Sequence, residues 1–216
     1  MKTIIVIPAR YKSSRFPGKP LVQLLNKPMI LWVAELSAKA VGNENVYIAT
    51  DDERIARTVT EAGFKAIMTN DAAPTGTDRL AEVAQKIEAD IYINVQGDEP
   101  LINPQDILNI IEAKKDNPDE VINGYSPLNE EEDPDNVNIP KVIFTENKHL
   151  VYMSRRALPG FKEKKNAQPI YYKQVCIYAF NRQELFDYAG FGRKSTLEFS
   201  EDIEIIRFLE WGKKIR

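Results

Sequence analysis

Short apolar runs alternate with segments of helical periodicity through the first 125 residues of the chain. Four short apolar runs predict β-strands: Lys2–Ile7, Asn45–Ala49, Lys65–Met68 and Asp90–Val95, of which the first and the last are expected to be buried. Four amphipathic segments that follow these runs predict helices: Met29–Ala40, Asp52–Ala62, Thr77–Glu88 and Asn103–Lys114. Strands that alternate with helices in this way are typical of an α/β domain built on a mostly parallel sheet.

The pattern changes in the second half of the chain. An acidic, proline-containing stretch over 129–140 predicts a solvated loop, and a lysine-rich stretch over 159–169 predicts a mobile loop or lid. Three further strands and a last helix are predicted over 141–144, 150–153, 175–180 and 197–211. A separate domain is not required. We therefore expect residues 1–216 to form one domain, with a core over about 1–125 and a second part over about 126–216 that extends the sheet.

Composition narrows the class of protein. A chain of 216 residues with 43% hydrophobic content can bury one substantial core. Its formal charge of -3 gives no basic footprint for a nucleic-acid polymer. No apolar run reaches the roughly 18 residues of a membrane span, and the N-terminus lacks a signal-peptide layout. The only cysteine, Cys176, lies in an apolar run, which predicts an inert buried thiol and fits a reducing cytoplasm. The only histidine, His149, excludes His-rich metal sites.

The most informative segment follows the first predicted strand. It reads Pro8-Ala9-Arg10-Tyr11-Lys12-Ser13-Ser14-Arg15-Phe16-Pro17-Gly18-Lys19. Its two arginines and Lys19 offer positive charge and hydrogen-bond donors, while Gly18 allows backbone N–H groups to approach a ligand. Open α/β sheets bind ligands beyond the carboxyl ends of their strands, where this segment lies. The pattern predicts a site for an anion, and the alternative is a solvated basic loop. The spacing matches neither a Walker loop nor a dinucleotide fingerprint.

Two further segments are candidates for chemistry. Asp98, in the run Asn94-Val95-Gln96-Gly97-Asp98-Glu99-Pro100, directly follows a predicted buried strand at the same sheet edge as Arg10 and Lys19. A carboxylate there can bind Mg²⁺, which shares its coordination with substrate phosphates. The alternative is a turn in which Asp98 caps the next helix. The run Thr75-Gly76-Thr77-Asp78-Arg79 precedes a predicted helix, and its hydroxyls are in themselves typical of helix capping.

Together these segments resemble the 3-deoxy-manno-octulosonate cytidylyltransferases, also called CMP-Kdo synthetases. That family combines a strand with Pro-Ala-Arg-Tyr, Ser, Arg and Pro-Gly-Lys-Pro-Leu, and all of these are present here. The resemblance implies a Rossmann-like nucleotide-diphospho-sugar transferase fold with helices flanking the sheet. It also implies a small dimerisation excursion in the second half, and a homodimer. The residues that it assigns to CTP are Pro8, Ala9, Arg10, Arg15, Lys19, Thr75, Gly76, Thr77 and Arg79.

The same resemblance implies which residues carry catalysis and which residues bind the sugar acid. Arg10, Lys19 and Asp98 would carry catalysis, with Asp98 as the Mg²⁺ ligand. Residues implied to bind the sugar acid are Gln96, Arg155, Gln174, Tyr178, Glu198 and Glu201. The arginine among them would pair with the sugar carboxylate, since a guanidinium fork matches that group. The two glutamates belong to a Leu-Glu-x-x-Glu-x-x-Glu-x-x-Arg spacing and would lie near the sugar hydroxyls; the alternative is a solvated acidic helix face.

The chain departs from the family pattern in two places. Gln174 stands where the family has a histidine, and Cys176 stands where it has a glycine, so the acceptor can be Kdo or a close analogue such as 8-amino-Kdo. The family's second metal-binding aspartate is not found before Arg216. We expect a truncated C-terminus, and the alternative is that Asp98 and the substrate hold the metal alone.

The implied reaction transfers CMP from CTP to the anomeric hydroxyl of a 3-deoxy-ulosonic acid and releases pyrophosphate, for lipopolysaccharide or capsule synthesis in the cytoplasm. Positioning and charge neutralisation would supply most of the rate. One alternative is a cytidylyltransferase for a sialic-acid-like nonulosonate. Another is a catalytically silent nucleotide-binding sensor.

Overall fold

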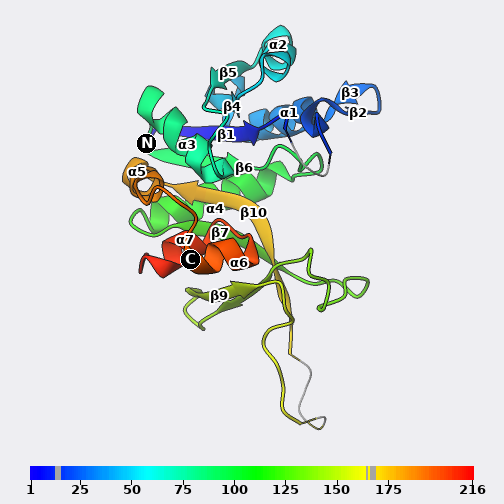
Figure 1. Cartoon of the computed structure of the whole chain (residues 1–216), viewed down its shortest axis with the longest axis vertical. Coiled ribbons are helices and arrows are strands. Elements are labelled where there is room, and N and C mark those ends of the chain that lie inside the picture. The colour runs from blue at the N-terminus through cyan, green and yellow to red at the C-terminus, as the bar shows by residue number, and fades with distance from the viewer. Residues whose placement is uncertain (13–15, 164, 166–168) are drawn as a thin grey trace.

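The strands of the computed structural model form one central sheet and one small hairpin. The structure describes residues 1–12, 16–163, 165 and 169–216. The strands are β1 (Thr3–Ala9), β2 (Gln23–Leu24), β3 (Lys27–Pro28), β4 (Val46–Thr50), β5 (Lys65–Met68), β6 (Ile91–Val95), β7 (Ile122–Pro127), β8 (Lys141–Phe144), β9 (Leu150–Ser154) and β10 (Tyr172–Phe180). The central sheet has the order β5-β4-β1-β6-β10-β8-β9, and β7 also pairs with β10 (Figure 1). The hairpin pairs β2 with β3.

The first half of the chain supplies the parallel part of this sheet. β1 pairs in parallel with β4 and with β6, and β4 pairs in parallel with β5. Parallel neighbours end at the same edge, so the segments that follow β1 and β6 come out side by side. The prediction of a mostly parallel central sheet is confirmed for this half. In the second half, β10 runs antiparallel to β6, β7 and β8, and β8 runs antiparallel to β9.

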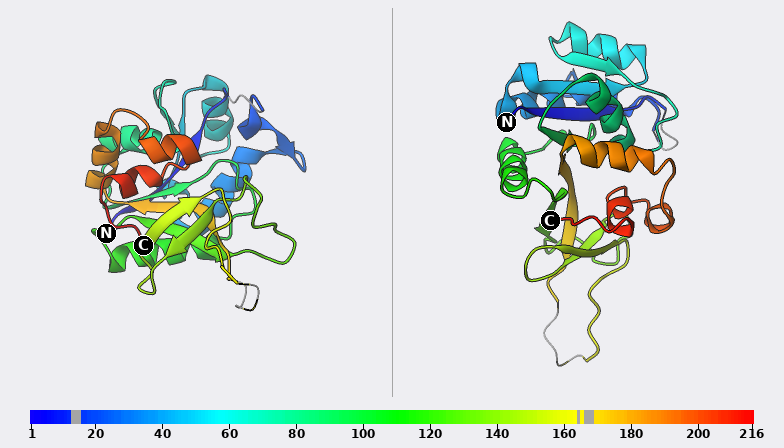
Figure 2. Two further views of the ribbon diagram at one scale, coloured as in Figure 1. Left: turned by 60° about the horizontal axis from the view of Figure 1, so that its bottom comes forward. Right: turned by 90° about the vertical axis from the view of Figure 1, so that its left-hand side faces the viewer.

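Helices cover both faces of the sheet (Figure 2). They are α1 (Met29–Val41), α2 (Glu53–Glu61), α3 (Gly76–Lys86), α4 (Pro104–Asp116), α5 (Arg182–Gly190), α6 (Thr196–Glu201) and α7 (Ile206–Glu210). Successive residues of β1 point to opposite faces, as the two-residue period of a strand requires. Ile4 and Val6 belong to the core cluster that includes residues of α3, α5 and α7, whereas Ile5 and Ile7 belong to the cluster that includes residues of α1, α2 and α4. Both faces of β1 are therefore buried, which explains its continuous apolar run.

The second half of the structure differs from the elements predicted there, and it contains helix α5, where the sequence pattern predicts no helix. The predicted single helix over 197–211 is wrong, because α6 ends where Asp202 adopts the left-handed conformation (φ 51°) and α7 begins only at Ile206. The strand β7 has no counterpart in the sequence analysis, since its sequence Ile122-Asn123-Gly124-Tyr125-Ser126-Pro127 carries little apolar signal. β7 forms by pairing with β10, a contact distant in sequence.

The segment between β9 and β10 extends away from the rest of the molecule (Figure 1). It contains the stretch 159–169 predicted as a mobile loop or lid, and residues 164 and 166–168 of that prediction lie outside the described residues. Phe161 and Ile170 on this excursion are 43% and 67% exposed. Among the described residues, no helix is long and apolar enough to cross a membrane.

Candidate active site

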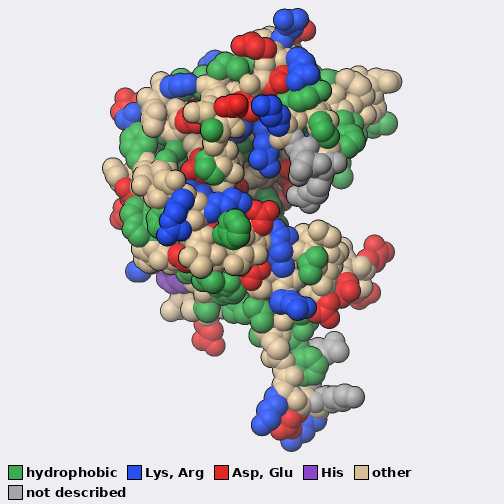
Figure 3. Space-filling model, viewed as in Figure 1, with side chains coloured by type: hydrophobic (Ala, Val, Ile, Leu, Met, Phe, Trp, Pro, Cys, Tyr) green, Lys and Arg blue, Asp and Glu red, His purple; other side chains and the backbone are tan. Residues whose placement is uncertain are grey.

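The candidate site lies at the carboxyl ends of β1 and β6, where the molecule is hollowed on the right-hand side of Figure 3. Pro8 and Ala9 form the end of β1, and Gln96, Gly97 and Asp98 follow β6. The two strand ends lie so close that a Cβ atom at position 97 would be 2.8 Å from the carbonyl oxygen of Pro8. Only glycine fits this approach. The sequence around residue 97 thus brings the segment with Asp98 against the segment with Arg10.

Lys19 and Asp98 meet across this edge. The Lys19 Nζ atom is 2.6 Å from Oδ2 of Asp98, and the two side chains are 42% and 48% exposed. Lys19 lies in a short 3₁₀ turn directly after Gly18, while Arg10 is exposed at the end of β1. Arg15 lies outside the described residues. The sequence-based placement of Lys19 and Asp98 at the same sheet edge therefore agrees with the structure, and both charged groups are reachable from solvent.

Asp98 is followed by a second carboxylate, Glu99. Burial raises the pKa of Glu99, the charge of Asp98 raises it further, and Lys19 opposes both effects. Among the described residues, no group of three or more Asp, Glu, His or Cys side chains is arranged to hold a metal ion. A Mg²⁺ ion that takes most of its ligands from water and phosphate needs few protein carboxylates. The donor set at Asp98 fits an ion of that kind, delivered with a triphosphate.

The start of α3 brings a second segment to the same edge. Thr75 is the N-cap of this helix and forms a capping box with Asp78, whose Oδ2 accepts from the Thr75 hydroxyl (2.8 Å) and backbone N–H (3.1 Å). The side chains of Thr75 and Asp78 therefore cap the helix, as the sequence pattern predicts. Gly76 begins the helix close to Pro8, with a would-be Cβ 3.1 Å from Pro8 Cγ. The backbone of Thr75, Gly76 and Thr77 consequently borders the end of β1.

Arg79 is buried and contacts other protein side chains. Its side chain is 3% exposed, and its guanidinium contacts Asp51 Oδ2 at 3.3 Å and the Thr69 hydroxyl at 2.7 Å. These contacts tie α3 to the end of β4 and to the segment after β5. The geometry fits the supporting role expected of Arg79, whereas direct contact with cytosine stays a prediction.

Glu204 is a site residue that the sequence analysis missed. Its carboxylate accepts from the backbone N–H of Thr77 at 2.9 Å and from the side-chain amide of Gln96 at 3.0 Å. Burial raises the pKa of Glu204. Since the NH₂ group of Gln96 is engaged by this carboxylate, its amide oxygen is left as the acceptor for another partner. The signal was present in the chain, because Glu204 is the third glutamate of the spacing that begins at Glu198.

On β10, Gln174 and Tyr178 are brought together by an irregularity in the strand. The pairing with β7 shifts between Val175 and Tyr178, and the Gln174 amide donates to the Tyr178 hydroxyl (3.2 Å) and to Asn123 Oδ1 (3.0 Å). Burial raises the pKa of Cys176 to about 11. This thiol is therefore neutral at physiological pH, in agreement with the predicted inert cysteine.

Arg155 and Glu201 lie together between β9 and α6. The Arg155 guanidinium donates to the carbonyl oxygens of Val137 (2.8 Å), Asp202 (3.1 Å) and Glu201. The Glu201 carboxylate accepts from the Ser154 hydroxyl (2.8 Å) and the Arg155 backbone N–H (2.9 Å). Both side chains are engaged by protein groups in this conformation, and their binding of a sugar acid stays a prediction.

The structure corrects the expected position of Glu198. This residue is 0% exposed, and Arg207 binds its carboxylate through Nε (2.7 Å) and Nη2 (2.8 Å). Arg207 also reaches Asp78 at 3.0 Å and stacks on Tyr188, with its Cζ 3.7 Å from the ring centroid. Glu198 therefore lies in an internal ion pair rather than on an open helix face, and this geometry does not favour contact with sugar hydroxyls.

Comparison with known proteins places this site in a family. The family model described as Cytidylyltransferase matches residues 4–215. The chain is 42% identical to the 3-deoxy-manno-octulosonate cytidylyltransferase of Thermodesulfovibrio yellowstonii, over 100% of this chain and 89% of that protein. It is 39% identical to the 8-amino-3,8-dideoxy-manno-octulosonate cytidylyltransferase of Shewanella oneidensis, with the same coverage.

A solved structure agrees with the sequence relatives. The chain superposes on a CMP:2-keto-3-deoxy-manno-octonic acid synthetase complexed with CTP with a TM-score of 0.91 and 40% identity, covering 100% of this chain and 88% of that one. This match confirms the expected α/β nucleotidyltransferase fold. The chain belongs to the cytidylyltransferase family and is a nucleotidyltransferase, as its motifs predict.

Proposed function

We propose that the protein transfers CMP from CTP to the anomeric hydroxyl of a 3-deoxy-ulosonic acid, Kdo or its 8-amino analogue, and releases pyrophosphate. The observation that carries this proposal is the contact of Lys19 with Asp98 at the carboxyl ends of β1 and β6. The half-exposed ammonium group of Lys19 can bind a triphosphate, and the half-exposed carboxylate of Asp98 can bind the metal ion that the triphosphate carries. The relatives at 39–42% identity are named for these two sugar acids.

Residues at the carboxyl ends of β1 and β6 are assigned to CTP and its metal ion. Asp98 would hold Mg²⁺, which when bound neutralises phosphate charge and lowers the pKa of the attacking hydroxyl. Lys19, which pairs with Asp98 in this structure, would bind triphosphate oxygens together with Arg10 and Arg15. The cations then stabilise the charge that develops on the leaving pyrophosphate. The backbone around Gly76 would border the cytosine.

On the acceptor side, Gln96 is the residue whose orientation the structure defines. Glu204 engages its NH₂ group, so its amide oxygen can accept a hydrogen bond from a sugar hydroxyl or from an ammonium group. We assign Arg155 to the sugar carboxylate, which requires the guanidinium to exchange part of its carbonyl contacts for that group. The chain's own contribution to the rate is thus orientation of two anionic substrates and neutralisation of their charge.

The reaction is tested by pyrophosphate release with CTP and Mg²⁺ and a panel of acceptors: Kdo, 8-amino-Kdo and N-acetylneuraminate. We expect turnover with one or both octulosonates and little with the nonulosonate. Preference for N-acetylneuraminate would move the protein to the sialic-acid branch. Silence with every acceptor, together with CTP binding, would favour the sensor alternative. Gln174 in place of the family's histidine is the observation that keeps 8-amino-Kdo in the panel.

We also propose that the protein is a homodimer that works in lipopolysaccharide or capsule synthesis in the cytoplasm. The extended excursion between β9 and β10, with the exposed apolar side chains of Phe161 and Ile170, supports a contact between two copies. Light scattering of the purified protein should give twice the mass of the chain. A monomer at micromolar concentration would remove this part of the proposal.

A further inference from the structure

Tyr11, the residue after Arg10, is stacked against an arginine from a different element. Arg54 lies in the first turn of α2, and its Cζ atom is 3.4 Å from the centroid of the Tyr11 ring. This distance is that of a guanidinium lying directly over an aromatic face. The contact joins α2 to the segment that carries the phosphate-binding cations, and the family motifs assign no role to Arg54.

Asp52 fixes the plane of the Arg54 guanidinium. Nε of Arg54 is 2.9 Å from Asp52 Oδ1, and Nη2 is 2.7 Å from Oδ2, which is a two-point pairing. Asp52 is also the N-cap of α2 and accepts the Arg54 backbone N–H at 2.9 Å. The side-chain hydrogen bond from Arg54 lowers the pKa of Asp52, so the pair stays charged at neutral pH. A rigid guanidinium plane is thereby presented to Tyr11.

Tyr11 is in turn tied to Gly18. The backbone N–H of Gly18 donates to the carbonyl oxygen of Tyr11 at 2.9 Å. Gly18 has φ +72°, and a Cβ atom there would be 3.0 Å from Cε2 of the tyrosine ring. Since Arg10 precedes Tyr11 and Lys19 follows Gly18, this one backbone hydrogen bond brings the backbones of the two cationic residues together. The position of Tyr11 therefore sets where both cations leave the backbone.

We propose that Arg54 is a positioning residue for triphosphate binding. Its stacked guanidinium holds Tyr11, and Tyr11 holds the Gly18 backbone from which Lys19 reaches Asp98. The inference rests on the proposed function, because it takes Arg10 and Lys19 to be the groups that bind CTP. It adds to that function a residue that acts through Tyr11 rather than by touching the nucleotide.

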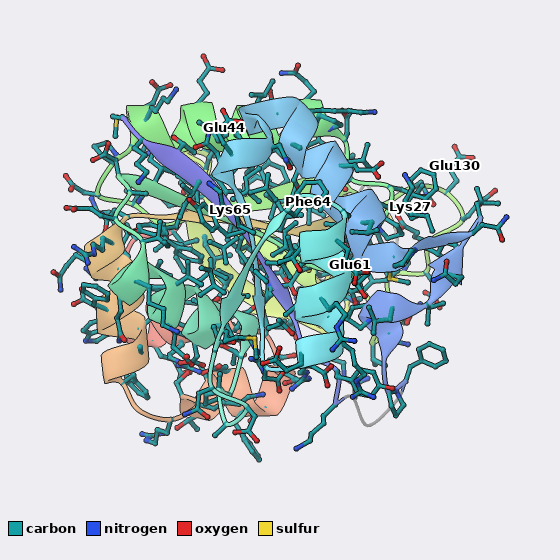
Figure 4. All side chains as sticks on the ribbon, turned by 90° about the horizontal axis from the view of Figure 1, so that it is seen from above. Lys27, Glu44, Glu61, Phe64, Lys65 and Glu130 are labelled. Atoms are coloured by element: carbon teal, nitrogen blue, oxygen red, sulfur yellow. The ribbon has the colours of Figure 1, made fainter. Side chains whose placement is uncertain are left out.

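The helix that carries Arg54 does not depend on its side chain. α2 is anchored by buried Ile55 and Val59, and Phe64, three residues after the helix and labelled in Figure 4, is 9% exposed. Lys65 donates to the carbonyl oxygen of Glu44 at 2.6 Å and fixes the next strand. The Arg54 side chain itself is 59% exposed. Its removal should therefore leave the fold intact, so that an effect on CTP can be separated from unfolding.

The test compares Arg54→Ala and Arg54→Lys with Arg57→Ala, an exposed arginine on the same helix. CTP binding with Mg²⁺ is measured by calorimetry, and KM is measured for CTP and for the sugar acid. We expect a rise of about two- to fivefold in Kd and KM for CTP with both Arg54 variants, the size of one exposed cation–π contact. The KM for the sugar acid and the melting temperature should match those of Arg57→Ala. Lysine should not rescue, because it keeps the charge but lacks the planar fork.

Two outcomes would overturn the inference. One is CTP binding by Arg54→Ala equal to that of Arg57→Ala. The other is full rescue by lysine, which would show that charge alone is at work. A double-mutant cycle with Tyr11→Leu should give non-additive effects, so that adding Arg54→Ala to Tyr11→Leu weakens CTP binding no further. Additive losses would again contradict the inference. Failure of the wild-type protein to bind CTP would instead overturn the proposed function, so the two failures are distinguishable.

Discussion

Charged side chains occupy two contrasting settings in this molecule. At the carboxyl edge of the parallel strands, Lys19 and Asp98 form a single contact of 2.6 Å with both side chains about half exposed. In the second half, Arg207 and Glu198 are 1% and 0% exposed, and the arginine is shared between Glu198, Asp78 and the ring of Tyr188. The first pair is exposed to solvent and can exchange partners with a ligand, whereas the second pair is buried.

The contrast indicates that the exposed charges of Lys19 and Asp98 are available to a ligand, whereas the buried charges of Arg207 and Glu198 hold elements of the fold together. An exposed pair contributes at most about 1 kcal/mol to stability, because water screens it. A buried pair contributes little net stability compared with apolar residues, yet losing one partner leaves an unpaired charge in the interior. Mutations at the sheet edge should therefore affect turnover more than folding. Mutations of the internal cluster should do the reverse.

The largest effect is expected for Arg207→Met. Removing this guanidinium leaves Glu198 and Asp78 without their cation inside the protein, which should cost about 3–5 kcal/mol of unfolding free energy. Urea unfolding monitored by circular dichroism measures it, with Arg193→Met, an exposed arginine of the same half, as the control. If the single variant does not fold, the double variant Arg207→Met/Glu198→Gln should recover part of the stability, since it removes the buried unpaired charge. A loss of unfolding free energy below about 1 kcal/mol for Arg207→Met would contradict the distinction between the buried and the exposed charged pairs.

Asp98→Asn should show the opposite pattern. We expect turnover to fall about a hundredfold or more, because the carboxylate that would hold Mg²⁺ is lost, while CTP affinity is partly kept. Unfolding free energy should change by less than about 1 kcal/mol, since the contact with Lys19 is exposed. The matched control is Asp116→Asn, an exposed aspartate on α4. Turnover at the wild-type rate would exclude Asp98 as the metal ligand.

The edge with Lys19 and Asp98 could be predicted because it depends on local signals. Apolar runs mark β1 and β6 as buried strands, and residues that follow the strands of an open α/β sheet are expected at its carboxyl edge. A glycine at position 97 and the Pro8-Ala9-Arg10 run are likewise visible without tertiary information. The placement of Lys19 and Asp98 at one sheet edge thus follows from strand pattern and motif alone, and their direct contact is seen only in the structure.

The position of Glu198 and the role of Glu204 could not be obtained in the same way. Helical periodicity over 197–211 indicates a continuous helix, but Asp202 breaks it, and Glu204, which follows this break, contacts Gln96 and Thr77. Glu198 is buried because Arg207, nine positions later, folds back onto it. Both outcomes depend on packing between elements, which outweighs local propensity.

Glu204 offers an intermediate case, because it is partly buried and hydrogen-bonded to a site residue. Glu204→Gln keeps the shape but leaves one acceptor oxygen for two donors, Thr77 N–H and the Gln96 amide. Loss of one charge-assisted hydrogen bond predicts a rise of about tenfold in KM for the sugar acid. Steady-state kinetics with each substrate varied in turn measures this, with Glu112→Gln as an exposed control. If KM for CTP rises and that for the sugar acid does not, Glu204 acts through Thr77 alone.

The smallest effect is expected for Gln174→His, which tests whether the antiparallel part of the sheet sets acceptor choice. Gln174 donates to Asn123 and to the Tyr178 hydroxyl, and a histidine has at most two ring nitrogens with which to replace these contacts. Because the resembled family carries histidine at this position, we expect preference to shift toward Kdo over 8-amino-Kdo, by a few-fold in kcat/KM. Competition between the two acids in one reaction, resolved by mass spectrometry of the CMP-sugars, measures the ratio directly. An unchanged ratio would take Gln174 out of the specificity argument and leave acceptor choice to residues such as Gln96, whose amide the partly buried carboxylate of Glu204 already orients.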